Sequence, residues 1–276
     1  MMKNLNIWFT DLDNTLIFSH RHEIPSPKLL AEYYQGREQS YMTELTLQFL
    51  RRFSERQGHL FVPLTTRNRE QYERIFLLRE KLSYSYALIA NGAVLLKNGE
   101  ENEQWTRDTL KMIEPAAAHL EKVYEVMQEH LGREHLHRND TYMVYARTEN
   151  EPAFFQYLEK TFAPHGIQVF YSGSKLHCFP AILSKGTAVK RFLSFLREEN
   201  VGTGNIRTIS SGDSSFDLSM LQETDISIYP DALSGYMPQN KQGYAVRVKA
   251  KSASVPLGEI DFSLVSVRAE ETDEQK

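Results

Sequence analysis

The chain has few of the features that mark secreted, membrane or nucleic-acid-binding proteins. Cys178 is its only cysteine, so no intramolecular disulfide can form. No apolar run approaches the ~20 residues of a membrane span, and Asp11 and Asp13 interrupt the apolar N-terminal stretch too early for a signal peptide. The 32 Lys and Arg against 36 Asp and Glu give a net charge of −4 with dispersed basic residues, which offers a nucleic-acid partner no electrostatic support. We therefore expect a cytoplasmic protein with neither a nucleic-acid nor a membrane partner.

Two acidic segments carry most of the functional information. Asp11-Leu12-Asp13-Asn14-Thr15-Leu16 follows the strand-like stretch Ile7-Trp8-Phe9, and Gly212-Asp213-Ser214-Ser215-Phe216-Asp217 follows the strand-like stretch 206–209. Open α/β sheets place their ligand sites at the carboxyl ends of strands. Carboxylates gathered there repel one another unless a cation lies between them, and a set of oxygen ligands favours Mg²⁺. The two segments predict a magnesium site.

The spacing within the first segment predicts two roles. Asp11 and Asp13 are two residues apart, so in extended chain both carboxylates can point to the same side. One can attack phosphorus and form an aspartyl-phosphate, while the other protonates the leaving oxygen and then activates water. The alternative interpretation is structural, an Asx turn followed by a helix N-cap.

Two further positions complete a candidate phosphate site. The stretch 59–64 reads as a buried strand that ends at Thr65, whose hydroxyl can donate a hydrogen bond to a phosphoryl oxygen. Lys185 stands at the start of an amphipathic helix, where a cation and helix amides can both face an anion. An isolated Thr or Lys is usually unrelated to function. The order acid pair, Thr, Lys, acid pair is hard to explain as packing.

With these four elements in place, the chain resembles a phosphatase of the haloacid dehalogenase superfamily. The match runs from the acid pair through Thr65 and Lys185 to the second acidic segment and so spans most of the chain. The resemblance implies that Asp11 is the nucleophile and Asp13 the general acid/base. It also implies that Thr65 and Lys185 hold the phosphoryl group.

The same resemblance implies a Mg²⁺ cofactor. Its ligands would be Asp11, the backbone carbonyl of Asp13, and Asp213, while Asp217 would orient Lys185 or a metal-bound water. One position departs from the family pattern, because members of this branch commonly carry Asn where this chain has Phe216. The departure removes an amide that could hold a metal water or a phosphate oxygen. We expect an altered but active enzyme.

The spacing of the motifs predicts two domains. Far more chain separates Thr65 from Lys185 than the dozen or so residues of a helical crossover. The inserted part shows a helical pattern over 113–131, a second helix from Pro152, and strands near 141–147 and 167–171. It resembles the large α/β cap of the Cof-like and sucrose-phosphatase-like branch, subfamily IIB. We expect an α/β protein: a Rossmann-like, parallel-sheet core formed by 1–91 and 179–276, and an α+β cap domain formed by 92–178.

The expected function is Mg²⁺-dependent hydrolysis of a small phosphorylated metabolite, a sugar phosphate or phosphorylated sugar derivative. Because the catalytic centre reads only the phosphate, the cap should read the rest of the substrate. The candidate substrate-binding residues are Arg67, Asn91, Arg147, Lys175 and His177. Two alternatives stay open: a phosphosugar mutase that uses the same aspartyl-phosphate, and a non-catalytic regulatory protein that binds a phosphorylated metabolite.

Overall fold

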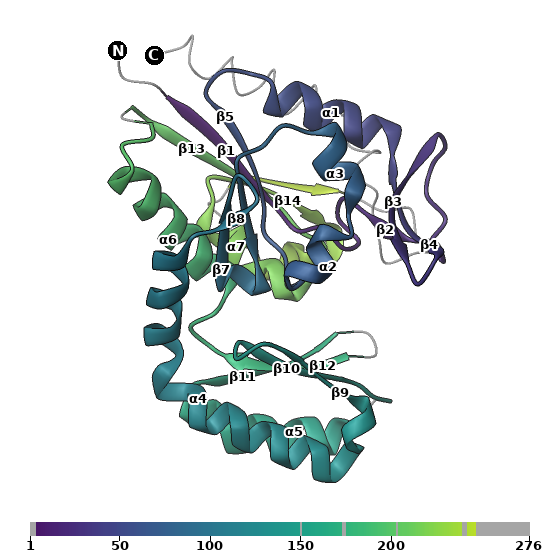
Figure 1. The fold of residues 1–276 in the computed structure, drawn as a ribbon, viewed down its shortest axis with the longest axis vertical. Helices are drawn as coiled ribbons and strands as arrows, with labels where there is room; N and C mark the ends of the chain where they lie inside the picture. Colours follow the sequence, from purple (N-terminus) through teal and green to yellow (C-terminus); the bar gives the residue numbers. More distant parts are fainter. Residues whose placement is uncertain (1–3, 150, 173–174, 203, 239–241, 247–276) are drawn as a thin grey trace.

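A five-stranded sheet forms the centre of the larger, upper part of the molecule (Figure 1). The computed structural model describes residues 4–149, 151–172, 175–202, 204–238 and 242–246. All four pairings in this sheet are parallel. In spatial order its strands are β15 (Gln242–Val246), β14 (Ile226–Pro230), β13 (Ile206–Ser211), β1 (Leu5–Thr10) and β5 (His59–Pro63). The predicted parallel-sheet core is confirmed.

Helices cover both faces of this sheet. They are α1 (Glu44–Ser54), α2 (Arg69–Glu73) and α3 (Phe76–Lys81) on one face, and α6 (Lys185–Glu198) and α7 (Leu218–Glu223) on the other. The alternation of side chains along β1 explains the two layers. Trp8 packs edge-on against Phe53 of α1, and its neighbour Phe9 packs against Phe192 of α6. Strands buried on both faces read as continuous apolar runs, as 7–9 does.

Two small antiparallel sheets flank the core. The sequence analysis did not predict the first, which consists of β2 (Phe18–Ser19), β3 (Lys28–Tyr34) and β4 (Arg37–Thr43) and lies between the first acidic segment and α1. The second consists of β6 (Tyr86–Ile89), β7 (Val94–Lys97) and β8 (Glu100–Glu101). A single bridge, from Leu64 to Leu88, joins β6 to the main sheet.

A four-stranded antiparallel sheet with two helices forms the smaller, lower part of the molecule. Its elements are α4 (Glu103–Leu131), β9 (Leu136–Asn139), β10 (Met143–Arg147), α5 (Pro152–Phe162), β11 (Ile167–Ser172) and β12 (Lys175–Pro180), with the strand order β11-β12-β10-β9. The predicted helices and the strands near 141–147 and 167–171 are therefore present. The prediction missed β9 and β12. Five short 3₁₀ turns complete the description: η1 (Ala90–Gly92), η2 (Arg133–His135), η3 (Ala163–His165), η4 (Ser215–Asp217) and η5 (Asp231–Tyr236).

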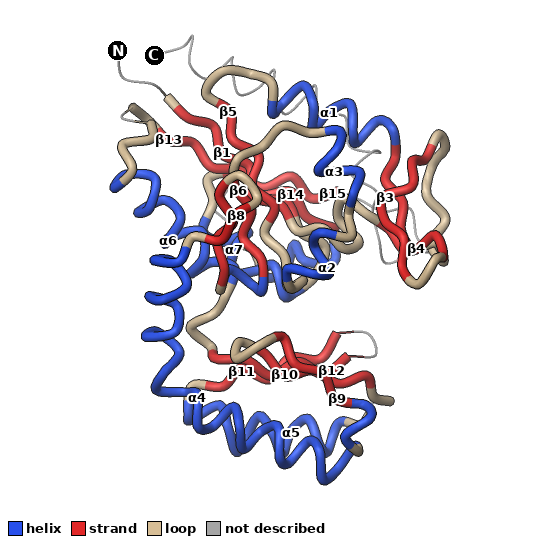
Figure 2. The backbone as a smooth tube through the Cα atoms, in the orientation of Figure 1, coloured by secondary structure: helices blue, strands red, loops and turns tan. Residues whose placement is uncertain are grey.

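Alternation along these strands decides which side chains look toward the core. Val144 and Cys178 belong to a hydrophobic cluster with residues of α4 and α5, which lie beneath the sheet in Figure 2. Their neighbours Tyr145 and His177 therefore point to the opposite face, because side chains alternate along a strand. That face is turned to the core in both ribbon views. The lower sheet thus presents the side chains of one of its faces, including Tyr145 and His177, to the core.

Helix α4 connects the two parts. Its Trp105 packs with core residues, whereas Val123 packs in the lower hydrophobic cluster. Pro115 lies inside the helix and cannot donate a backbone hydrogen bond, and α4 changes direction between its two halves in Figure 1. The division of the chain at residues 92 and 178 stays a prediction. Helix α4 belongs to the predicted cap segment, yet it packs against the core as well as against the lower sheet.

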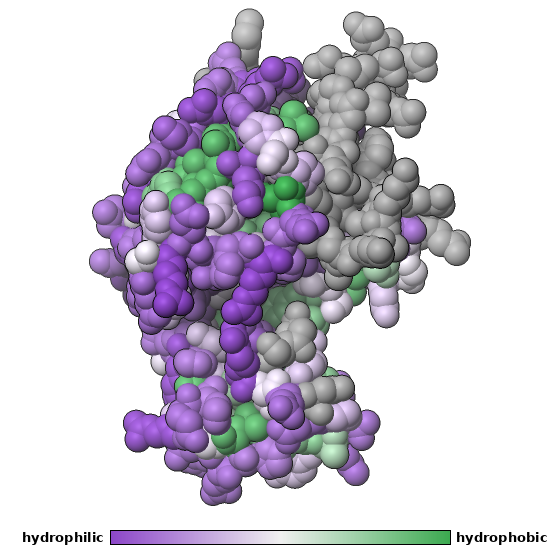
Figure 3. Space-filling view, turned by 90° about the vertical axis from the view of Figure 1, so that its right-hand side faces the viewer, coloured by the Kyte–Doolittle hydropathy of each residue, from purple (hydrophilic) through white to green (hydrophobic). Residues whose placement is uncertain are grey.

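Viewed from the side, the molecule narrows between its two parts, and its surface is mostly hydrophilic (Figure 3). Among the described residues no helix combines the length and the apolar character that a membrane span needs. Strand β15 ends at Val246, the last residue that the structure describes. The polar tail at 270–276 lies outside the described residues.

Candidate active site

Three side chains from distant segments meet at the carboxyl edge of the main sheet. Asp11 directly follows β1, Asp217 lies in the loop after β13, and Lys185 is the first residue of α6. The Lys185 ammonium donates to Asp11 Oδ1 over 2.5 Å and to Asp217 Oδ1 over 2.6 Å. The side chains of Lys185 and Asp217 are 1% and 0% exposed, so this is an ion triad shielded from water.

Local structure at the start of α6 aims Lys185 at the two acids. Ser184 caps the helix, because its side chain accepts a hydrogen bond from the Thr187 N–H. Gly186 lets α6 approach α7 closely. A Cβ at this position would lie 2.6 Å from the backbone oxygen of Ser219. A larger residue there would push the helix start, and Lys185 with it, away from the acids.

Asp217 also organises the loop that carries Asp213. Its Oδ2 accepts hydrogen bonds from the backbone N–H groups of Asp213 and Ser214 over 3.1 and 3.0 Å. Asp213 in turn accepts a hydrogen bond from the Thr15 hydroxyl over 3.3 Å. Oxygen atoms of Asp11, Asp213 and Asp217 all lie within 4.8 Å of one another. The sequence-predicted acids after β1 and β13 therefore do converge.

The electrostatics of this cluster show an excess of negative charge. Burial raises the pKa of Asp11 to about 7, against the attraction of Lys185 and with the help of Asp217. Burial, Asp217 and Asp11 raise the pKa of Asp213 well above its ordinary value. Burial would lower the pKa of Lys185, but its two carboxylate partners raise it instead. One ammonium does not balance three carboxylates, and a further cation would stabilise them.

Asp13 lies outside this triad and is bound to Arg67. The Arg67 Nε and Nη2 donate to the two Asp13 oxygens over 2.8 and 2.7 Å. Partial burial on its own would raise the pKa of Asp13, and the charge and hydrogen bonds of Arg67 lower it below its ordinary value. Arg67, expected to contact substrate, is also bound to the buried Glu32 of β3, which the sequence analysis missed.

Thr65 and Asn91 are both buried beside the acids. Thr65 is fully buried, and its Oγ1 accepts a hydrogen bond from the Arg67 N–H over 3.2 Å. Asn91 is 2% exposed, and its side-chain amide donates to the backbone oxygen of Leu183, two residues before Lys185. Asn91 was expected to contact the substrate. In this structure its amide nitrogen holds the loop that leads to Lys185, and the expected contact with substrate stays a prediction.

The three cap candidates share the face of the lower sheet that is turned to the core. Arg147 and Lys175 are register partners on β10 and β12. Lys175 interacts electrostatically with Asp13 and with Arg67. Burial, with Lys175 nearby, lowers the pKa of His177 to about 4, so its ring is neutral near pH 7. The structure therefore brings Lys175 within electrostatic range of Asp13, with Arg147 and His177 on the same face of the sheet.

Phe216 packs against the cap rather than against the acids. Its ring centroid lies 4.5 Å from that of Phe170, 5.7 Å from that of His177 and 5.2 Å from that of Phe179, all on β11 or β12. A second contact across the same boundary is the hydrogen bond from Asn139 Nδ2 to the Thr66 backbone oxygen, over 3.1 Å. The departure at position 216 therefore has a packing explanation that the sequence analysis did not foresee.

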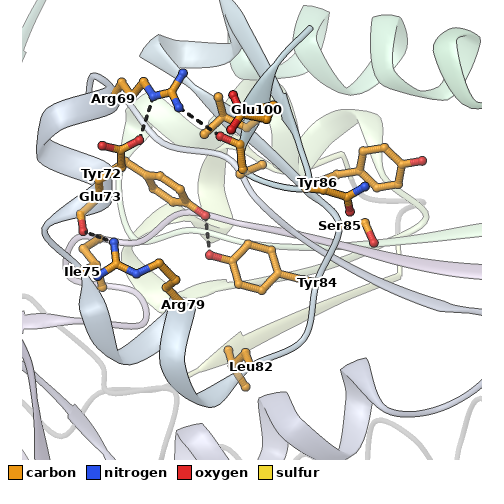
Figure 4. A pocket seen from close by; sticks show the side chains of 14 residues that line it. Arg69, Tyr72, Glu73, Ile75, Arg79, Leu82, Tyr84, Ser85, Tyr86 and Glu100 are labelled. Atoms are coloured by element: carbon orange, nitrogen blue, oxygen red, sulfur yellow. Dashed lines mark hydrogen bonds and ion pairs between the residues drawn. The ribbon is translucent and has the colours of Figure 1, made fainter.

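A cavity of about 500 Å³ lies elsewhere, between α2, α3 and β6–β8 (Figure 4). Its wall includes the hydroxyl pair of Tyr72 and Tyr84, 2.6 Å apart. None of the acids described above lines it. Tyr84 and Tyr86 both line this cavity, and Tyr86 is 7% exposed.

Comparisons with known proteins agree with this arrangement. Neither a protein-family model nor a curated protein sequence matches the chain. Solved structures do match. A sucrose-phosphatase from Synechocystis sp. PCC6803, in complex with sucrose and phosphate, aligns with a TM-score of 0.58 at 14% identity over 98% of both chains. A protein from Thermoplasma acidophilum aligns with a TM-score of 0.54 at 16% identity, over 95% of this chain and 99% of the other.

A trehalose-6-phosphate phosphatase related protein aligns with a TM-score of 0.50 at 16% identity, over 88% of this chain and 91% of the other. The parallel sheet with its inserted cap is thus shared along nearly the whole chain. The protein has the haloacid dehalogenase fold. The fold implied by the sequence resemblance is confirmed, and in this fold the acids after β1 and β13 lie at the edge where open α/β sheets bind ligands.

The first prediction concerns Phe216 as a link between cap and core. Phe216→Asn removes its three aromatic contacts, which are worth about 1–2 kcal/mol together, and should lower the melting temperature by about 2–8 °C. Phe216→Leu keeps an apolar side chain and should lose less. Differential scanning calorimetry of the two variants checks this. A stabilised Phe216→Asn protein with tighter Mg²⁺ binding would show that the position favours an amide.

The second prediction concerns the buried His177. An unfolded histidine protonates near its ordinary pKa of 6.5, whereas folded His177 stays neutral down to about pH 4. Between these values the unfolded chain binds more protons, so the contribution of His177 to stability is present above pH 6.5 and is lost as the pH falls toward 4. His177→Gln should remove this pH-dependent part, up to about 3 kcal/mol.

The measurement is urea denaturation of wild type and variant at several pH values. His137→Gln removes an exposed ring from β9, two strands away from β12, and controls for the loss of an imidazole from the same sheet. A stability difference between wild type and His177→Gln that is the same at pH 7 and pH 4 would contradict the prediction.

Proposed function

We propose that this protein is a phosphoric monoester hydrolase that acts through an aspartyl-phosphate on Asp11. The observation that carries the proposal is the buried ion triad: Lys185 lies between Asp11 and Asp217 at the carboxyl edge of a parallel sheet. A structural salt bridge does not need a further unpaired acid beside it, yet Asp213 lies within 4.8 Å of this cluster. That surplus is typical of a site that binds a cation and a phosphoryl group.

In the proposed reaction Asp11 attacks phosphorus, and the bond from phosphorus to the ester oxygen breaks. The Lys185 ammonium and the Thr65 hydroxyl donate to the phosphoryl oxygens, which gain negative charge in the transition state. The hydroxyl proton of Thr65 has no acceptor within the described part of the chain, so it can be donated. Water then hydrolyses the aspartyl-phosphate and releases inorganic phosphate.

Asp13 handles the protons in both steps. As an acid it protonates the leaving oxygen, and as a base it takes a proton from the attacking water. The contact with Arg67 favours the ionised form that the second step needs. For the first step, Asp13 has to take up a proton while the substrate is bound. The negative charge of the incoming phosphate favours that uptake.

The residues fit a magnesium ion. Asp217 uses both of its oxygens on Lys185 and on backbone N–H groups, which leaves Asp11 and Asp213 as the carboxylate ligands. The backbone oxygen of Asp13 would be a third ligand. Burial, together with repulsion by Asp217 and Asp11, raises the pKa of Asp213, and a divalent cation would stabilise its ionised form. When bound, Mg²⁺ would supply charge stabilisation for the phosphoryl oxygens.

The proposed substrate is a small sugar phosphate or phosphorylated sugar derivative. The solved sucrose-phosphatase with the same fold was determined in complex with sucrose and phosphate. In this chain Arg147, Lys175 and His177 face the site from the cap and offer hydrogen-bond donors to a polyhydroxyl group. A mutase or a non-catalytic binding protein would use the same residues, and a time course of released inorganic phosphate separates the hydrolase from both.

The third prediction is that turnover requires both Asp11 and Mg²⁺. Asp11→Asn keeps the shape but removes the nucleophilic charge, so the release of phosphate from p-nitrophenyl phosphate should fall at least about a thousandfold. Asp108→Asn changes an exposed acid of α4 and serves as the matched control. Chelation of Mg²⁺ should abolish turnover in wild type. Undiminished release by the Asp11 variant would rule out the covalent route.

The fourth prediction assigns substrate reading to the cap. Lys175→Gln removes a cation that faces Asp13 from the cap and should raise KM for the preferred sugar phosphate about tenfold. Turnover of p-nitrophenyl phosphate, which has no sugar to read, should change less than about twofold. Lys160→Gln, on the exposed side of α5, is the control. A uniform loss on both substrates would place Lys175 in phosphate binding instead.

A further inference from the structure

Arg67 is held between two carboxylates from different parts of the chain. Its Nε and Nη2 donate to Asp13, its Nη1 and Nη2 donate to Glu32 over 2.6 and 3.0 Å, and its Nη1 also donates to the backbone oxygen of Gln71 over 2.9 Å. A guanidinium has five N–H groups in a rigid, planar fork. These five bonds use all of them. Arg67 therefore has one orientation that satisfies every donor, and Asp13 lies at one end of it.

Glu32 reaches Arg67 because of an irregularity in β3. The pairing of β3 with β4 shifts register on both sides of Glu32. Such bulges redirect a side chain and are frequent near active sites. Glu32 is 1% exposed, although Tyr33 next to it is 52% exposed. A buried carboxylate is costly unless it is paired, so its position depends on the positive charge of Arg67.

Two arginines lie near the Glu32 carboxylate. Arg74 of the segment after α2 places its Nε 4.0 Å from Glu32 Oε2, and this Nε is buried with no hydrogen-bond partner among the described residues. Arg67 is the only group that Glu32 hydrogen-bonds through its side chain in the described ranges. Among the described residues, the arginine that binds Asp13 is thus also the one that holds the Glu32 carboxylate by hydrogen bonds, while Arg74 lies farther away.

We propose that Glu32 is a positioning residue: it fixes the Arg67 fork and, through it, the orientation of the Asp13 side chain. The sheet formed by β2, β3 and β4 would then be part of the catalytic apparatus, although none of its residues is expected to touch the substrate. Asp13 needs such support. Its side chain is 49% exposed on the loop after β1, and Arg67 is its only hydrogen-bonded side-chain partner in the described ranges. The inference rests on the proposed role of Asp13.

The kinetic test compares two leaving groups. Glu32→Gln keeps the volume of the side chain but replaces one of the two carboxylate oxygens by an NH₂ group. This NH₂ group cannot accept a hydrogen bond from the guanidinium. Misplacing the acid should lower kcat about tenfold with an alkyl phosphate, whose leaving oxygen needs a proton. With p-nitrophenyl phosphate, which leaves without protonation, kcat should change less than about twofold. KM should be unchanged for both, because Glu32 does not contact substrate.

The matched control is Glu70→Gln. Glu70 is an exposed acid of α2 that lies 4.0 Å from Arg74, the same arginine that approaches Glu32, and it does not contact Arg67. It removes one negative charge from the same neighbourhood and should leave both kcat values unchanged. If Glu32→Gln does not fold, as judged by circular dichroism, Glu32→Asp replaces it. The shorter side chain keeps the charge but withdraws the carboxylate from Arg67.

The deciding experiment is a double-mutant cycle with Asp13→Asn. If Glu32 acts through Asp13, the Glu32 variant should cause no further loss with the alkyl phosphate once Asp13 is replaced. An equal loss in both backgrounds overturns the inference, as does an equal loss on both leaving groups. Melting temperatures of the same four proteins test the linkage without activity. If the two substitutions lower the melting temperature additively, the link between Glu32 and Asp13 is overturned, whether or not the protein hydrolyses phosphate esters. A wild-type protein without hydrolase activity would separately refute the proposed function.

Discussion

The ammonium of Lys185, buried between Asp11 and Asp217, is the interaction on which the rest of the site depends. Removing a charge from water costs several kcal/mol unless its partners are well placed, so the triad persists only while three segments keep their positions. Those segments are the end of β1, the loop after β13 and the start of α6. The pairing of β1 with β13 fixes two of them, and the capped start of α6 supplies the third. The fold therefore positions the site by ordinary sheet and helix geometry.

The cap meets this rigid centre through a different kind of contact. Phe216 stands next to Asp217 in sequence and packs against Phe170 and Phe179 of the lower sheet. Apolar contacts are non-directional, so they can form again after separation without the exact alignment that a hydrogen bond needs. A polar side chain at this position would lack these aromatic contacts. The ring instead connects the loop that carries the acids to the face of the cap that carries His177.

A second ionic network holds the side chain of Asp13. Arg67 follows Thr65 by two residues. It donates all five of its guanidinium N–H groups, to Asp13, to Glu32 and to the backbone oxygen of Gln71. Asp11 and Asp13 thus have unlike environments although they are two residues apart. Burial raises the pKa of Asp11, whereas Arg67 lowers that of Asp13. The surroundings of each carboxylate, rather than its place in the sequence, therefore set the direction of its pKa shift.

The sequence by itself determined the features that follow from local patterns. The apolar stretch before Asp11, the helical period over 113–131 and the position of Lys185 at a helix start all predict their elements, because side-chain period and capping act within a few residues. Only the tertiary structure decided that Asn91 holds the loop of Leu183, that Phe216 contacts the cap, and that a register shift in β3 brings Glu32 to Arg67. These pairings join segments far apart in the chain. Their choice depends on strand order and register, which no local pattern encodes.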